Sequence, residues 1–284
     1  MAADMSMTIR PLSGALGAEV LRIDLSAPMS NSDWSKVQDA FRRFHVIFFR
    51  DQTITPEQHI AFAKRFGALE GYPFVDGMPD HPELIEVVKL PGEVRNFGAG
   101  WHADMSFRAE PPLGAVLYAK EVPPVGGDTM FANLHAAYAS LSDGMKSLAG
   151  RLRLIHDSGD FKADNYQGMK ARATGAVRDQ HAHPLVRRHP VTGHALLAVS
   201  PVYARCFEDM TTEESTPLLD YFNKVAVLPE HCCRFRWAAG SIAVWDNRCL
   251  LHNALNDDFG ARFKGQGFKR VMQRATIATA AKGL

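Results

Sequence analysis

From residue 84 onward, the sequence is a series of short apolar segments, each bounded by Gly, Pro, Asn or Asp. These segments are 84–90, 114–122, 127–131, 195–200, 241–246 and 270–278. Short strands separated by turn residues are typical of a β-sandwich or barrel, and not of a doubly wound parallel sheet. The sequence therefore predicts a mainly β fold with flanking helices.

The N-terminal part carries clear helix signals. Ser30 is placed to cap a helix that runs to about Phe44 and has apolar residues on one face. Thr55 followed by Pro56 begins a second helix, which we expect to end at about Phe66. Short strands are expected within 8–25 and at 45–50, and further helices near 133–150 and 211–226.

The stretch 157–182 is polar, contains glycine and is only weakly periodic. A polar insertion of this length is usually a lid or a binding loop. No segment has the composition of a linker between two folding units, so we expect one domain over residues 1–284.

Charge and cysteine content narrow the functional classes. The formal net charge is +1, which points to neither nucleic acid nor a membrane surface as a partner. The apolar runs are too short for a spanning helix, and the N-terminus lacks the pattern of a secretory signal. Four cysteines without C-x-x-C spacing favour reduced thiols and a cytoplasmic location.

His102 and Asp104 form a His-x-Asp pair, and His252 follows about 150 residues later. On a strand, alternate side chains share a face, so the pair can point into one cavity. Two histidines and one carboxylate are the ligands of the facial triad that binds non-haem Fe(II) and leaves three positions open. On spacing alone, a surface histidine beside a turn aspartate remains an alternative.

Eight sequence blocks, among them Trp101-His-Ala-Asp-Met-Ser-Phe and Trp245-Asp-Asn-Arg-Cys-Leu-Leu-His, resemble the taurine dioxygenase / chlorophenoxyacetate dioxygenase (TauD/TfdA-like) family. Members are Fe(II)- and 2-oxoglutarate-dependent dioxygenases. The blocks occur in family order and cover nearly the whole chain, at 12–20, 48–52, 60–67, 101–107, 125–131, 183–190, 245–252 and 270–276. The resemblance implies a double-stranded β-helix (jelly-roll) core with flanking helices.

The resemblance also implies roles for individual residues. His102, Asp104 and His252 match the iron ligands. Thr129 and Arg270 match the residues that bind the distal carboxylate of 2-oxoglutarate. Arg274 matches the arginine that holds an anionic substrate, and its even spacing from Arg270 places both on one strand face.

Two departures from the family pattern affect these assignments. The segment between His252 and Arg270 is longer than expected, so Arg262 is an alternative to Arg270. The polar residues that bind taurine in taurine-specific members are missing, which favours a larger or more apolar organic acid as the substrate. Tyr72, Phe74 and Phe107 are the candidate pocket walls.

Other polar residues of these blocks are interpreted as structural. The Trp245-Asp-Asn-Arg segment is expected to form a turn that presents His252, and His183 and His189 are expected to be structural or surface histidines.

The sequence thus predicts a dioxygenase that uses Fe(II), 2-oxoglutarate and O2 and hydroxylates a small organic acid of the sulfonate, alkyl sulfate or aryloxyalkanoate type, releasing succinate and CO2. Two alternatives are a metal-dependent hydrolase on a jelly roll and a non-catalytic jelly-roll binding protein. By analogy with the family, a homo-oligomer is an alternative to a monomer.

Overall fold

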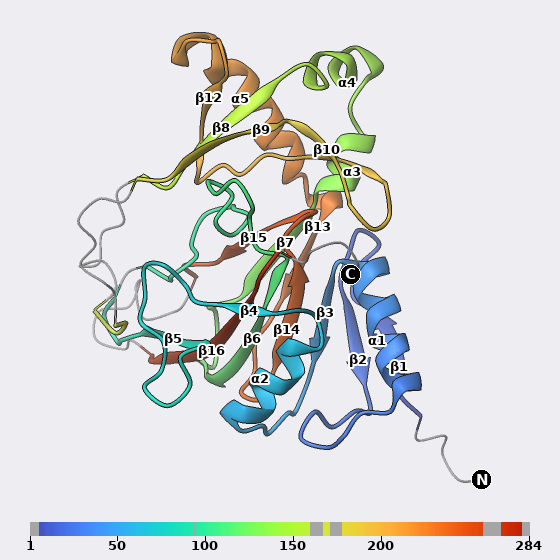
Figure 1. Ribbon diagram of the computed structural model, residues 1–284, viewed down its shortest axis with the longest axis vertical. Helices are drawn as coiled ribbons and strands as arrows, with labels where there is room; N and C mark the ends of the chain where they lie inside the picture. The colour runs from blue at the N-terminus through green and yellow to red at the C-terminus, as the bar shows by residue number, and fades with distance from the viewer. Residues whose placement is uncertain (1–5, 94, 160–166, 171–177, 258–267, 280–284) are drawn as a thin grey trace.

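Strands dominate the computed structural model, which describes residues 6–93, 95–159, 167–170, 178–257 and 268–279. The strands are β1 (Thr8–Pro11), β2 (Ala18–Leu21), β3 (Val46–Phe49), β4 (Leu69–Glu70), β5 (Leu84–Lys89), β6 (Gly114–Glu121), β7 (Thr129–Asn133), β8 (Arg153–Asp157), β9 (Gln180–Pro184), β10 (Val186–Arg188), β11 (Ala195–Leu197), β12 (Ala204–Phe207), β13 (Cys232–Phe235), β14 (Ile242–Asp246), β15 (Leu250–Ala254) and β16 (Arg270–Ile277). The helices are α1 (Asn31–Phe44), α2 (Pro56–Lys64), α3 (Leu134–Ala139), α4 (Asp143–Ala149), α5 (Thr212–Ala226) and the 3-10 helix η2 (Pro229–His231). The predicted mainly β fold with flanking helices is confirmed (Figure 1).

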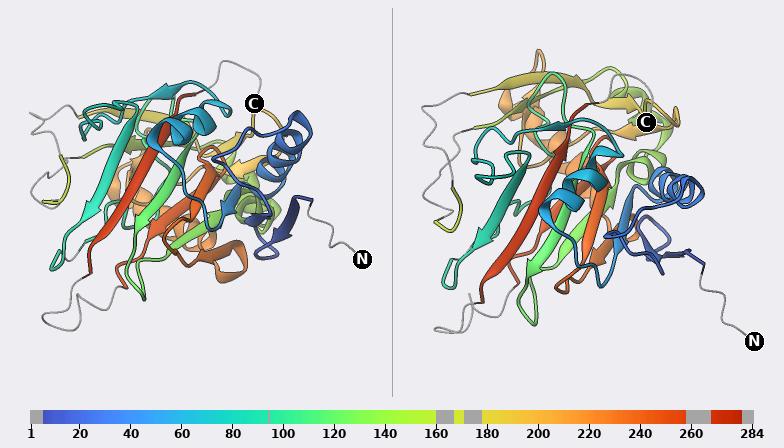
Figure 2. Two further views of the ribbon diagram at one scale, coloured as in Figure 1. Left: turned by 90° about the horizontal axis from the view of Figure 1, so that it is seen from below. Right: turned by 60° about the horizontal axis from the view of Figure 1, so that its bottom comes forward.

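Two sheets provide the framework of the site. The larger has eight strands in the order β1-β2-β3-β14-β6-β16-β4, with β5 also paired to β16. The smaller has the order β13-β7-β15. Figure 2 shows the strands of the larger sheet side by side, with α2 lying across one face.

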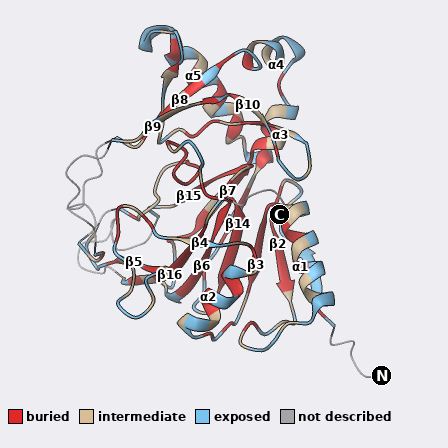
Figure 3. Cartoon of the chain, in the orientation of Figure 1, coloured by how far each residue is buried: buried red, intermediate tan, exposed pale blue. Residues whose placement is uncertain are grey.

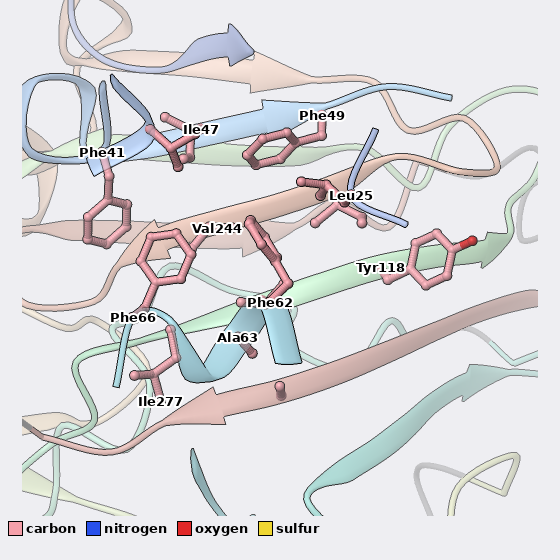
Figure 4. Close-up of a cluster of buried hydrophobic side chains, with 14 of the residues drawn as sticks. Leu25, Phe41, Ile47, Phe49, Phe62, Ala63, Phe66, Tyr118, Val244 and Ile277 are labelled. Atoms are coloured by element: carbon pink, nitrogen blue, oxygen red, sulfur yellow. The ribbon is translucent and has the colours of Figure 1, made fainter. Parts of the chain in front are cut away.

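Alternation along β3 explains how the larger sheet is buried on both faces. Ile47 and Phe49 belong to the apolar cluster that α1 and α2 cover, together with Phe62 and Phe66 (Figure 4). Val46 and Phe48 point the other way, because successive side chains of a strand face opposite sides. Phe48 stacks on Phe235 of β13, with 3.9 Å between ring centroids. The inner strands β3 and β14 are accordingly buried at every residue (Figure 3).

The N-terminal helices begin where the sequence predicts. Ser30 caps α1 by accepting a hydrogen bond from the Asp33 backbone, and Thr55 caps α2 in a capping box with Gln58. The second helix ends at Lys64, two residues before the expected end.

The segment 133–150 is not one helix, so that expectation was wrong. It forms α3 and α4, because the Ser142 side chain accepts a hydrogen bond from the Met145 backbone and starts a new helix there. Leu141, between the two helices, is buried in a third apolar cluster with α5.

The polar stretch 157–182 connects β8 to β9, which pair antiparallel. Residues 160–166 and 171–177 lie outside the described part of the chain. The described residues 167–170 contact the loop between β4 and β5, where the Asp76 backbone N–H donates to Lys170 O over 3.0 Å. A role as a lid stays a prediction.

Candidate active site

A short backbone bridge brings the two predicted histidine ligands together. His252 lies on β15, and its backbone exchanges two hydrogen bonds with His102, at 3.0 and 2.9 Å. The imidazole centroids are 4.2 Å apart. The strand pairing therefore aligns both rings, although the residues are 150 positions apart in the sequence.

Asp104 completes a compact group with these histidines. Its Oδ1 lies 3.7 Å from His102 Nε2 and 3.6 Å from His252 Nε2. One ligand atom from each of the three residues lies within 4.8 Å of the other two, and all three side chains are buried. This is a spacing at which one ion can bind all three.

The protonation states suit a metal. Burial alone raises the pKa of the Asp104 carboxyl, but Arg274, His252 and His102 together hold that pKa well below its usual range. Burial, and next the proximity of His102, lower the pKa of His252 to about 3. His102 Nδ1 lies 2.8 Å from Gly100 O, so its N–H donates there and leaves the Nε2 lone pair for a ligand. A carboxylate and neutral imidazoles are the donors that Fe(II) binds.

Asn247 fixes the backbone of Asp104. Its Oδ1 accepts from the Asp104 N–H over 2.6 Å, and its Nδ2 donates to Asp104 O over 2.9 Å and to Pro112 O over 3.1 Å. Trp245 Nε1 donates to Asp104 Oδ2 over 3.3 Å. Trp245 and Asp246 end β14, and the turn to β15 begins only at Asn247, two residues later than the sequence predicts. This segment also holds the His-x-Asp residues, a contact that the sequence did not reveal.

Arg274 on β16 forms an ion pair with Asp104. Its Nη2 lies 2.8 Å from Asp104 Oδ2, and both side chains are buried. The guanidinium carbon is 5.3 Å from the Tyr72 ring centroid and 5.6 Å from that of Trp245. The buried charge is thus held by one carboxylate and two aromatic faces.

A cavity of about 470 Å³, partly open to solvent, lies against this group. Thr129 on β7 and Arg270 on β16 both line it, together with Arg274. Thr129 Oγ1 accepts a hydrogen bond from Trp237 Nε1 over 2.9 Å. Its own proton is therefore available to a negatively charged ligand.

The predicted pocket walls lie partly behind this cavity. Tyr72 contacts Arg274, and its ring is 5.9 Å from Phe74, which in turn is 6.0 Å from Phe107. None of the three predicted wall residues lines the cavity. Its apolar walls are Val87, Phe97, Leu117, Phe131, Trp237, Trp245 and Ala254, which come from separate elements whose contacts no local sequence pattern reveals. Arg262, the alternative to Arg270, lies outside the described residues.

Two more groups of metal-type side chains occur in the described ranges, and both include Cys249. In one of them, Asp246 accepts from Arg248 and from His189 Nε2, so its oxygens are already paired. Burial raises the pKa of the Cys249 thiol well above its usual value. Like His189, His183 is buried and hydrogen-bonded, in its case to Arg108 O over 2.9 Å. A structural role explains these contacts of His183 and His189.

Comparison with known proteins agrees with this geometry. The model of the family described as "Taurine catabolism dioxygenase TauD, TfdA family" matches residues 8–276. The chain belongs to this family. Its TauD/TfdA membership confirms the predicted resemblance and the jelly-roll core.

Relatives of this TauD/TfdA member are dioxygenases. The α-ketoglutarate-dependent sulfate ester dioxygenase of Pseudomonas putida is 29% identical, covering 96% of this chain and 90% of its own length. The (S)-phenoxypropionate/α-ketoglutarate-dioxygenase of Sphingobium herbicidovorans is 32% identical, with 95% and 94% covered. A crystal structure of a taurine dioxygenase from Burkholderia xenovorans is 34% identical and has a TM-score of 0.80, with 97% and 92% covered.

The predicted enzyme class is therefore confirmed: this TauD/TfdA member is an Fe(II)- and 2-oxoglutarate-dependent dioxygenase that acts with O2 on a small molecule. The comparisons favour this class over the hydrolase and the non-catalytic binding protein. No helix in the described ranges is long and apolar enough to cross a membrane.

Proposed function

We propose that His102, Asp104 and His252 hold the iron of this dioxygenase. The proposal is supported by the convergence of their ligand atoms at the wall of the cavity and by the hydrogen bond that orients His102. Iron and 2-oxoglutarate, when bound, supply oxidative decarboxylation to succinate and CO2, coupled to hydroxylation of the substrate. The protein contributes ligand geometry, co-substrate binding and the exclusion of water.

We propose that Arg270 and Thr129 bind the distal carboxylate of 2-oxoglutarate. Arg270 is buried in the cavity wall, and a guanidinium forms paired charge-assisted hydrogen bonds with a carboxylate. Thr129 can donate its hydroxyl proton beside it, because Trp237 already occupies an acceptor position of that oxygen. Trp237 thus sets the direction in which Thr129 donates.

Arg274 is proposed to hold the acid group of the substrate. Arg274 is the counter-charge of Asp104 in this structure. A metal ion bound to Asp104 would take over that role, leaving the guanidinium able to bind a second anion in the cavity. Metal binding would in this way prepare the substrate site.

The proposed substrate is a sulfonate, alkyl sulfate or aryloxyalkanoate with an apolar body. The aromatic and aliphatic walls of the cavity support an alkyl or aryl group beside Arg274. Relatives named for sulfate esters and phenoxypropionate have substrates of this kind. Tyr72 would contact the arginine head, while Phe74 and Phe107 would support Tyr72 from behind.

The test compares wild type with Arg274→Ala on hexyl sulfate, 2-phenoxypropionate and taurine. Product formation should be highest with one of the two apolar acids and should fall at least about 100-fold in the variant, since a buried charge pair is lost. Succinate formed without substrate should survive. Equal loss of both activities would contradict the role in substrate binding, and preferred turnover of taurine would contradict the substrate class.

We further propose a single domain over residues 1–284 and a cytoplasmic location. The location is supported by the four cysteines, which are free thiols in this structure. The proposed partners are an anionic small molecule and O2, with no nucleic acid and no membrane. Sedimentation analysis would decide between a monomer and the homo-oligomer that the family analogy leaves open.

A further inference from the structure

A second cavity lies on the other side of the His-x-Asp segment. Its volume is also about 470 Å³, and none of the described residues lines both cavities. The polar residues of its lining are Ser106, His156, His183, Arg187, Asn247 and Arg248. Two contacts place β8 and β9 against the segment before β6: His156 Nδ1 lies 2.9 Å from Ser106 Oγ, and His183 Nε2 lies 2.9 Å from Arg108 O.

Arg187 gives this cavity an unbalanced positive charge. Its side chain is half-buried, and burial alone lowers the pKa of its guanidinium. Among the described residues, no carboxylate lies within ion-pair distance of it, and none lines the cavity. The other cation in the wall, Arg248, is already paired with Asp246.

His156 adds an unused polar atom. The side chain is only 2% exposed, and Nδ1 lies 2.9 Å from Ser106 Oγ. Nε2 is buried and has no hydrogen-bond partner among the described residues. Burial, and next the neighbours His183 and Arg187, lower the pKa of His156 to about 3, so the ring is neutral. If Ser106 donates its proton to Nδ1, then Nε2 carries a hydrogen that is free to donate.

The remaining wall is apolar. Pro111, Leu134, Leu196 and Val199 enclose the space beside these donors. A ligand that satisfies the whole lining needs a negatively charged oxygen at one end and a few carbon atoms at the other. We propose that this cavity binds a small carboxylic acid with a short apolar body, whose oxygens accept hydrogen bonds from Arg187 and His156.

The cavity lies next to residues that position the proposed iron ligands, so a ligand bound in it would contact the supports of the iron site. Ala103 stands between the two proposed ligands His102 and Asp104, and Asn247 holds the Asp104 backbone. All of these residues belong to the segment or the turn that sets the direction of the Asp104 carboxylate. An acid bound here would contact the supports of the iron site without entering the catalytic cavity.

Calorimetric titration with isobutyrate and with isobutyramide tests the proposal. The two probes have nearly the same shape, but only the first is an anion at neutral pH. Wild-type protein, loaded with Mn(II) and 2-oxoglutarate, should bind isobutyrate at this site and bind isobutyramide at least about tenfold more weakly, the difference expected when a charge-assisted hydrogen bond is lost. Equal affinity for the two probes would overturn the proposal, and this comparison needs no substitution at the cavity.

Two variants of one strand then locate the site. Arg187→Gln should lower the isobutyrate affinity at least about tenfold. Arg188→Gln is the matched control, because Arg188 is the exposed neighbour on β10 and donates to Gly193 O; it should bind as wild type does. If isobutyrate binding survives in Arg187→Gln but is lost in Arg274→Met, the acid binds in the catalytic cavity and the proposal is wrong.

Discussion

A metal ion held by Asp104 would neutralise the carboxylate that Arg274 neutralises, which predicts how the variant Arg274→Met responds to metal. Arg274 Nη2 lies 2.8 Å from Asp104 Oδ2, and the side chains are 5% and 2% exposed. Removing one partner of such a buried pair costs about 3–5 kcal/mol, because the remaining charge has no counter-charge. Methionine keeps most of the side-chain volume, so this cost belongs mainly to the charge.

Bound metal should relieve most of the cost. In the loaded protein the ion compensates Asp104, and the variant should lose only about 1 kcal/mol, typical of a tolerated substitution. The lost contacts with Tyr72 and Trp245 are common to both states and cancel in the comparison. The variant should therefore gain at least about 2 kcal/mol more stability from metal than wild type does, equivalent to roughly 30-fold tighter binding.

The assay is urea unfolding of the metal-free and the Mn(II)-saturated protein at neutral pH, for both wild type and variant. Arg270→Met is the control, since it removes the same charge from the same cavity but leaves the Asp104–Arg274 pair in place. Its gain from Mn(II) should be clearly smaller. An equal gain in wild type and in Arg274→Met would refute the idea that bound metal compensates Asp104 when Arg274 is absent.

Three further predictions follow from the site. Arg270→Ala should raise the KM for 2-oxoglutarate strongly, because an unpaired buried carboxylate costs about 2–5 kcal/mol, whereas Arg262→Ala should have little effect. If steady-state kinetics give the reverse ranking, Arg262 and not Arg270 binds the distal carboxylate. Asn247→Ala should reduce kcat with near-normal 2-oxoglutarate KM, since it frees the Asp104 backbone, and an unchanged kcat would contradict its positioning role. The pKa of His252 is lowered to about 3, and that of His59 to about 4, from an ordinary 6.5, so the unfolded chain binds more protons than the folded chain below pH 6.5. The free energy of unfolding of the metal-free protein should therefore be highest above pH 6.5 and should fall as the pH drops toward 4. Urea midpoints that stay constant over that range would contradict this prediction.

The sequence predicts the parts of the fold that local chemistry determines. The caps at Ser30 and Thr55 begin helices by hydrogen bonds within three residues, so the pattern is visible in the chain. The break in 133–150 depends on Ser142 and on the burial of Leu141 against α5, and the second of these contacts is distant in the sequence.

In the candidate site, too, the sequence predicts the motif residues but not the contacts between segments that are distant in the chain. The motif order predicts that His102, Asp104 and His252 meet, and the structure brings them together. The ion pair of Arg274 with Asp104 and the hydrogen bond from Trp237 to Thr129 join separate strands, and no spacing reveals them. Phe97 lines the cavity, whereas Tyr72, Phe74 and Phe107 do not, because pocket walls depend on how loops pack.

Metal stoichiometry tests the central claim, that His102, Asp104 and His252 hold the iron, most directly. Mn(II) is a redox-inert probe, and the free ion can be counted by electron paramagnetic resonance during titration of the protein. Wild type should bind one Mn(II) per chain, and Asp104→Ala and His252→Ala should bind none over the same range. His135→Ala, which alters another group of metal-type side chains, should bind one ion as wild type does. Retained binding in Asp104→Ala and His252→Ala, or its loss only in His135→Ala, would contradict the assignment.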